Sequence, residues 1–294
     1  MSDHDFELFT SLRYDPLLLS SPENCSPSLS FQSPSPFYML VYHRDRMLEA
    51  ARHFDWQKVA DRLQNGIELS NTLLRHVKEY QKKNEARDGP LKIKILFDDQ
   101  GSLGTELSPI PSVSLETLYP PSLSPPFNPP SSKTLILDTE PTHSSSYTSL
   151  KTTNRRHYDS ARTRSLRATA DEVLLFNECD EITEGTMTSV YLFKGGRWVT
   201  PPVGVPYGRY PSKQATEATA GERRTPFPGR WGHSVRSEYS GSGGQRGTTR
   251  RWALTKALCI EEVTGRLSLS EGEGAWISNG VRGFKYGYIT LQKP

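Results

Sequence analysis

Apolar residues recur along this chain with two different spacings, and the spacing changes from segment to segment. In residues 71–83 they form one stripe at helical spacing, which predicts a helix capped by Asn71. Residues 91–97, LKIKILF, alternate with period two, which predicts a strand with one buried face. The same reasoning predicts further helices over 42–63 (in two parts, the second from Trp56), 155–168 and 248–258, and strands over 6–14, 134–138, 172–177, 276–279 and 286–291. Residues 189–202 predict a hairpin that turns at Gly195-Gly196.

Breaks in this pattern indicate how the chain is organised. Residues 108–132 are rich in Pro and Ser and predict an irregular connector. A Ser-rich crossing at 144–149 suggests a boundary between a smaller N-terminal α/β domain, residues 1–145, and a larger C-terminal domain, residues 146–294. Residues 203–243 have no periodicity and few aliphatic side chains, so we expect a disordered insertion or a retained intron translated in frame.

The charge, the cysteine spacing and the apolar runs of the chain argue against several classes of function. The net charge of +3 is too small to indicate nucleic-acid binding. The three cysteines are far apart, so they predict neither a metal site nor a disulfide framework. The acidic start lacks an apolar run, and no uncharged stretch is long enough to span a bilayer. We therefore expect a soluble cytoplasmic protein that acts on a small molecule, without nucleic acid, membrane or metal.

Two ionisable residues are candidates for chemistry. Lys151 lies in SLKTTNRRHY, where a loop changes to a helix, and the neighbouring Arg155 and Arg156 favour the neutral amine that a Schiff base requires. Glu184 lies in ITEGTMTSVYLF, in a turn before a strand, where a carboxylate can pair with a protonated pyridine nitrogen. The alternatives are an ordinary surface lysine and an ordinary turn glutamate.

Two further segments are suited to an anion. Gly247, Thr248 and Thr249 open a predicted helix, where backbone N–H groups and hydroxyls can bind a phosphate. Arg46, near the start of another predicted helix, can reach a phosphate or a carboxylate. The alternatives are a simple helix cap and an exposed charge.

The order of these segments resembles that of the class IV aminotransferases, the fold-type-IV enzymes of pyridoxal 5′-phosphate (PLP). The matching segments are FTSLR (9–13), HRDRM (43–47), KTTNR (151–155), TEGTMTSVY (183–191), GTTR (247–250) and SNG (278–280). Two features depart from the family pattern. Ser189 stands where the family has Asn, and an extra segment follows the Thr-Pro-Pro turn at 200–202.

The resemblance implies a fold, a cofactor and a set of site residues. The fold is α/β with two domains and PLP at their interface, in a homodimer. Lys151 would form the Schiff base and act as the catalytic base and acid, and Glu184 would contact the pyridine nitrogen. Cofactor contacts are also implied for Arg46, Gly247, Thr248, Thr249 and Asn279.

Within the family, KTTNR and SNG favour 4-amino-4-deoxychorismate lyase, which releases pyruvate to form 4-aminobenzoate for folate biosynthesis. The alternatives are a transaminase of branched-chain or D-amino acids, and an inactive member with a disrupted phosphate loop. Arg13 is a candidate for binding a substrate carboxylate, with a structural ion pair as the alternative.

Overall fold

The computed structural model describes residues 6–84, 88–127, 133–165, 170–203 and 243–292. The chain divides into two compact units. The N-terminal unit comprises residues 1–120, 151–154 and 280–283, and the C-terminal unit comprises 121–150, 155–279 and 284–294. The predicted boundary at 145/146 therefore lies inside the C-terminal unit. The reason is that the strand at 133–137 pairs with distant strands of the C-terminal sheet.

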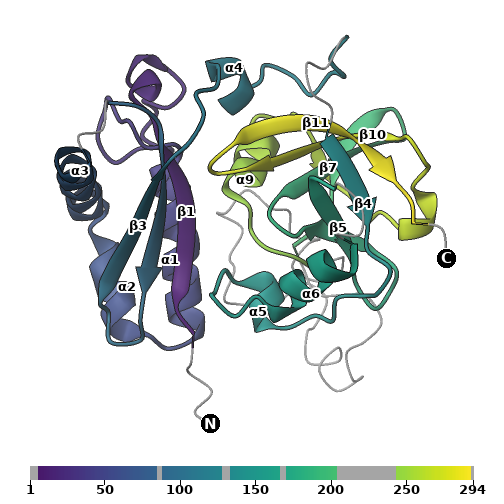
Figure 1. Cartoon of the computed structure of the whole chain (residues 1–294), viewed down its shortest axis with the longest axis horizontal. Helices are drawn as coiled ribbons and strands as arrows, with labels where there is room; N and C mark the ends of the chain where they lie inside the picture. The colour runs from purple at the N-terminus through teal and green to yellow at the C-terminus, as the bar shows by residue number, and fades with distance from the viewer. Residues whose placement is uncertain (1–5, 85–87, 128–132, 166–169, 204–242, 293–294) are drawn as a thin grey trace, which may run out of the picture. The chain divides into compact units, whose positions relative to one another are not determined.

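The N-terminal unit is built on a three-stranded antiparallel sheet in the order β1-β2-β3 (Figure 1). Its elements are β1 (Leu8–Tyr14), β2 (Leu91–Phe97), β3 (Leu103–Pro109), the helices α1 (Leu40–His53), α2 (Gln57–Gln64), α3 (Gly66–Lys83) and α4 (Leu115–Leu118), and the 3-10 turn η1 (Pro16–Ser20). Strands β1 and β2 are confirmed predictions. Strand β3 was not predicted, because its residues are at most partly buried and show no apolar alternation.

Helix α3 begins earlier than its apolar stripe suggests. Its N-cap is Asn65, whose side chain accepts from the backbone N–H of Glu68 at 3.0 Å, so the predicted cap at Asn71 is wrong. The first turn carries Ile67, which is 50% exposed and therefore breaks the pattern of buried positions. Gly66 is required there, because a Cβ atom would overlap the ring of Phe31.

Residues 151–154 extend along the edge of β1. The N–H of Phe9 donates to the carbonyl of Lys151 at 3.2 Å, and the N–H of Thr153 donates to the carbonyl of Glu7 at 2.9 Å. These bonds hold the backbone of Lys151 in the N-terminal unit, although the sequence predicted that this residue belongs to the C-terminal domain.

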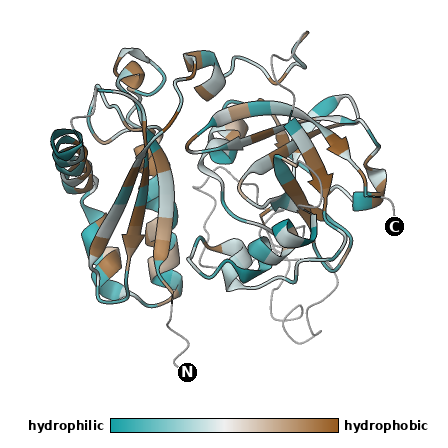
Figure 2. Cartoon of the chain, viewed as in Figure 1, coloured by the Kyte–Doolittle hydropathy of each residue, from teal (hydrophilic) through white to brown (hydrophobic). Residues whose placement is uncertain are grey.

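The C-terminal unit is built on an eight-stranded mixed sheet in the order β6-β5-β4-β11-β10-β7-β8-β9. Its strands are β4 (Lys133–Leu137), β5 (Glu172–Phe176), β6 (Ile182–Gly185), β7 (Ser189–Lys194), β8 (Arg197–Thr200), β9 (Ile260–Glu261), β10 (Gly274–Asn279) and β11 (Gly283–Thr290). Its helical elements are α5 (Ser146–Ser149), α6 (Arg156–Ser165), α9 (Thr248–Thr255) and the 3-10 turn η2 (Arg266–Ser268). Hydrophobic residues gather on the strands, as Figure 2 shows, and pack into the core of the unit.

Most of these elements were predicted, including the hairpin β7–β8, which turns at Gly195 and Gly196 with φ of 56° and 79°. The two short strands β6 and β9 were not predicted. No helix among the described residues has the length and hydropathy that a membrane crossing requires.

Arg250 fastens the start of α9 to the end of the β7–β8 hairpin. Its guanidinium donates to the carbonyl of Pro201 from Nη2 at 2.8 Å and from Nε at 3.3 Å, and it forms a buried ion pair with Glu261. Residues 204–242, nearly all of the predicted insertion at 203–243, lie outside the described residues, so that interpretation stays a prediction.

Candidate active site

In the N-terminal unit, the buried side chains of Thr10 and His43 meet the guanidinium of Arg46. Thr10 lies on β1, and the other two lie on α1. Thr10 Oγ1 is 2.7 Å from His43 Nδ1, and Arg46 donates to Thr10 Oγ1 from Nε at 3.0 Å and also from Nη2. Arg46 Nη2 lies 3.3 Å from His43 Nδ1.

The protons of this cluster can be assigned. An arginine only donates, and Arg46 Nη2 approaches both Thr10 Oγ1 and His43 Nδ1, so Nδ1 is an acceptor and the ring proton of His43 is on Nε2. Thr10 then gives its own proton to Nδ1. Burial holds the pKa of His43 well below its usual value, and the charges of Arg46 and then Lys151 add to this effect. His43 is therefore neutral, and it orients Arg46 without adding charge.

Lys151 lies in the same unit as Arg46. Its Nζ atom is 4.7 Å from the centroid of the Phe9 ring, on β1, and its side chain is half-buried. Lys94 approaches the same ring at 5.7 Å. The face of an aromatic ring attracts the charged form of an amine, so Phe9 holds the side chain of Lys151 beside β1.

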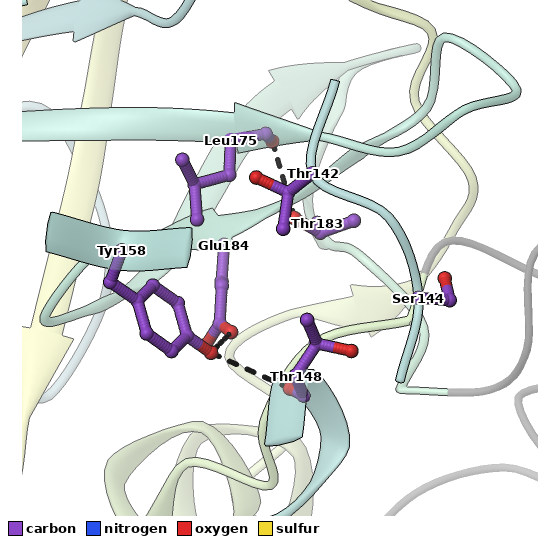
Figure 3. Close-up of a pocket in the computed structure, with 8 residues that line it drawn as sticks. Thr142, Ser144, Thr148, Tyr158, Leu175, Thr183 and Glu184 are labelled. Carbon is purple, nitrogen blue, oxygen red and sulfur yellow. Dashed lines mark hydrogen bonds between the residues drawn. The ribbon is translucent and has the colours of Figure 1, made fainter. Parts of the chain in front are cut away.

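In the C-terminal unit, the carboxylate of Glu184 is buried at the end of β6. Its Oε1 atom accepts from the phenol of Tyr158, on α6, at 2.6 Å. Gln245 Nε2 lies 2.9 Å from the same phenol oxygen. Figure 3 shows Tyr158 pointing at Glu184, with Thr142 and Thr148 around the small polar pocket beside them.

The predicted phosphate loop lies in the same unit and begins α9 at Thr248, with Gly247 as the N-cap residue. Glycine offers no side chain to satisfy the first N–H groups of the helix, and its Cα packs so closely on Ser189 Oγ that a Cβ would overlap it. Thr249 is fully buried and accepts from Ser278 Oγ at 2.7 Å. The segment GTTR therefore forms the helix N-terminus that the sequence predicts, and Thr249 is also part of the packing.

The turn that joins β6 to β7 is held by Glu172, a residue that the sequence analysis did not single out. Its Oε1 accepts from the hydroxyl of Thr186 at 2.6 Å and from the N–H of Val173 at 3.0 Å. Its Oε2 accepts from the hydroxyl of Thr188 at 2.8 Å and from the N–H of Met187 at 3.2 Å. This carboxylate fixes the turn that follows Glu184.

The remaining two predicted residues have different surroundings. Asn279, at the end of β10, donates to the carbonyl of Met187 at 3.4 Å, which brings it to the same β6–β7 turn. Arg13 is 1% exposed and pairs with Asp15 at 2.6 Å, and its other donors reach the carbonyls of Pro111 and Val281. These contacts fit the alternative interpretation of Arg13 as a partner in a structural ion pair. We therefore do not keep Arg13 as a candidate for binding substrate.

Tyr158, Glu172 and Gln245 were missed because local patterns do not distinguish them. Tyr158 lies in the Arg-rich segment RHYDSARTRS, and Gln245 directly follows the segment predicted as an insertion. Their roles depend on hydrogen bonds to residues 14 or more positions away, and no local pattern in the sequence predicts such pairings.

The chemistry of these groups fits PLP. A helix N-terminus with hydroxyl residues suits a phosphate, as does an arginine; a half-buried lysine suits an aldehyde, and a buried carboxylate suits a protonated pyridine nitrogen. Arg46 and Lys151 belong to the N-terminal unit, and Glu184, Thr248 and Thr249 belong to the C-terminal unit.

Comparisons with known proteins agree with this interpretation. The sequence model of the amino-transferase class IV family matches residues 29–205, which is more than half of the chain. The chain therefore belongs to the class IV aminotransferases. A search of the curated proteins finds no match.

Solved structures of aminotransferases and of a lyase have a similar fold. A proposed amino-acid aminotransferase from Mesorhizobium loti is 18% identical with a TM-score of 0.59, and the match covers 97% of this chain and 100% of the other. A proposed 4-amino-4-deoxychorismate lyase from Legionella pneumophila is 13% identical with a TM-score of 0.58 and coverages of 98% and 83%. A branched-chain aminotransferase from Thermoproteus uzoniensis is 13% identical with a TM-score of 0.59 and coverages of 98% and 80%. Together they confirm the predicted α/β fold, and they leave the reaction open.

Proposed function

We propose that this protein is a PLP-dependent lyase that releases pyruvate from 4-amino-4-deoxychorismate and leaves 4-aminobenzoate. The observation that supports the proposal is that the C-terminal unit holds both the predicted phosphate loop and the buried carboxylate of Glu184. Gly244, three residues before Gly247, packs beside this carboxylate, since a Cβ atom built on it would be 3.5 Å from the carboxyl carbon of Glu184 and 3.3 Å from the carbonyl of Thr183. One unit thus brings the segment before the loop next to the carboxylate.

Each residue has a distinct part in this proposal. Thr248 and Thr249 would hold the phosphate through the N-terminus of α9, and Arg46, in the N-terminal unit, would supply a charged donor for it. Glu184 binds the protonated ring nitrogen. Lys151 would hold the aldehyde, and its free amine would remove and return a proton. PLP, when bound, supplies the electron sink for this chemistry.

The choice of the lyase rests on the sequence segments KTTNR and SNG, which contain Asn154 and Asn279. The transaminase remains the second candidate, because structures of branched-chain aminotransferases share the fold equally well. Against the inactive alternative, α9 begins at Thr248 with Gly247 as its cap, so the phosphate loop has its expected local structure.

The deciding experiment measures pyruvate released from 4-amino-4-deoxychorismate by the purified full chain with PLP and without any 2-oxoacid. A lactate dehydrogenase assay reports the pyruvate. We expect turnover by the natural chain, none by Lys151→Ala, and little change for Lys94→Ala, which removes a second amine beside the same Phe9 ring.

The reaction classes give different results in this assay. Activity that appears only when a 2-oxoacid is added would assign the protein to the transaminases. Full activity of Lys151→Ala, or PLP fixed by borohydride to another lysine, would overturn the site itself.

A further inference from the structure

Tyr158 connects the phosphate loop to Glu184 through consecutive hydrogen bonds. Gln245, two residues before Gly247, lies 2.9 Å from the phenol oxygen, and the phenol lies 2.6 Å from Glu184 Oε1. All of these residues belong to the C-terminal unit. Figure 3 shows the phenol and the carboxylate facing each other. The pairing joins an α-helix, a strand and a loop that are distant in sequence.

The direction of each bond follows from the chemistry of the groups. The phenol has one proton, and an ionised carboxylate can only accept, so Tyr158 donates to Glu184. Gln245 must then present its N–H to the phenol oxygen. Burial, followed by the charge of Glu184 and the hydrogen bond to it, raises the pKa of Tyr158 well above its usual value, so the phenol keeps its proton.

Packing fixes the ring of Tyr158 independently of its hydroxyl. The ring packs with Ala161, Val173 and Leu175 in a buried cluster, and the guanidinium of Arg155 lies 4.5 Å from its centroid. The phenol oxygen is therefore held in place, with Glu184 Oε1 at 2.6 Å as its short acceptor and the carbonyl of Thr148 at a longer 3.5 Å. Removing the oxygen alone leaves this packing in place, which makes the role of the hydroxyl separable from folding.

We propose that Tyr158 is a positioning residue, which holds the Glu184 carboxylate ionised and in one orientation and ties that orientation to the phosphate loop through Gln245. This inference rests on the proposed binding of PLP. A charge-assisted hydrogen bond stabilises the ionised carboxylate, and an ionised, oriented carboxylate is what a protonated ring nitrogen requires. Tyr158 itself touches neither substrate nor the reacting atoms in this proposal.

The test compares Tyr158→Phe with the natural chain in the full-length protein. PLP affinity is measured by titration, the visible absorbance spectrum of the bound cofactor is recorded, and melting temperature checks the fold. We expect Tyr158→Phe to fold and to bind PLP about tenfold or more weakly, with a shifted spectrum and a lower kcat, as the loss of a charge-assisted bond of about 1.5 kcal/mol or more implies.

Tyr14→Phe is a matched control. Tyr14 is also a buried tyrosine whose phenol donates to a carboxylate, that of Asp88, at 3.0 Å, and it has no part in the proposed site. We expect Tyr14→Phe to keep the natural PLP affinity and spectrum. Gln245→Met, which removes the donor to the phenol, should weaken PLP binding in the same direction as Tyr158→Phe.

The outcomes separate this inference from the proposed function. If the natural chain binds no PLP on Lys151, the proposed function fails. If the natural chain binds PLP and Tyr158→Phe has the same affinity and spectrum, the positioning role is wrong and the function stands. If Tyr158→Phe does not fold, Gln245→Met decides: natural affinity in that variant would overturn the inference.

Discussion

Replacing Glu172 by Gln is expected to destabilise the protein although only one atom changes. The side chain is 1% exposed, and each carboxylate oxygen accepts from one hydroxyl and one backbone N–H. Its Oε1 atom also forms an ion pair with Arg162 at 3.7 Å. In Gln, an amide nitrogen replaces one of these oxygens. A hydroxyl can turn to accept from the nitrogen, but a backbone N–H cannot, so one buried N–H loses its partner.

The expected loss in the free energy of unfolding follows from the bonds that the carboxylate makes. An unpaired buried N–H costs about 1–3 kcal/mol, and the remaining bonds lose their charge assistance, so the free energy of unfolding should fall by about 2–4 kcal/mol. For a chain of this size, that corresponds to a melting temperature lower by roughly 5–10 °C. PLP affinity should fall as well, because the affected turn directly follows Glu184.

Thermal unfolding followed by circular dichroism measures the loss. Glu262→Gln is the matched control, since Glu262 forms an ion pair with Arg197 at 2.8 Å in which the arginine side chain is 59% exposed. An exposed pair contributes at most about 1 kcal/mol. If Glu172→Gln melts no lower than Glu262→Gln, the argument that Glu172 holds this turn is wrong.

Two further predictions concern proton binding and close packing. Burial holds the pKa of His43 well below its usual value, so only the unfolded chain takes up a proton as the pH falls below about 6.5, and stability should fall by up to about 1.4 kcal/mol per pH unit. His43→Gln should reduce this dependence of the free energy of unfolding on pH, measured by urea unfolding between about pH 5 and pH 7. His157, whose pKa is lowered to about 4, keeps its own contribution in this variant. An unchanged dependence would contradict the conclusion that His43 is neutral in the folded protein. Gly247→Ala should lower stability by about 1–3 kcal/mol and weaken PLP binding, because the new methyl group overlaps Ser189 Oγ. Adding Ser189→Ala should restore part of both losses, and strictly additive effects in this double-mutant cycle would rule out the overlap as the cause.

The sequence predicts those elements whose burial follows a regular period. The first four residues of strand β2 alternate between buried and partly buried, and its pattern was visible in LKIKILF. Strands β6 and β9 are short, and β3 is nowhere fully buried, so none of them has such a pattern. The domain boundary was misplaced for a different reason. Strand β4 joins β5 and β11 by parallel pairing, and such a distant pairing leaves no local trace in the sequence.

The sequence predicted only those residues of the candidate site that lie within the family motifs. Glu184 and the helix start at Thr248 lie in one unit, and Arg46 and Lys151 lie in the other, while their roles toward the cofactor stay predictions. Tyr158 and Glu172 could not be predicted, because their function arises from the geometry of polar contacts within the folded unit. Arg13 was singled out by a motif that resembles the family's, but its hydrogen bonds are to other residues of the N-terminal unit.

The ion pair and hydrogen bonds of Arg250 have an implication for how this gene can change. They attach the beginning of α9 to Pro201 and Glu261, so the helix is anchored by residues on either side of the long connection. Once two ends are fixed to the folded body, lengthening the chain between them adds only a logarithmically growing entropy cost. A change in length between Pro201 and Gly247 that leaves Arg250 and its two partners in place should therefore preserve the start of α9.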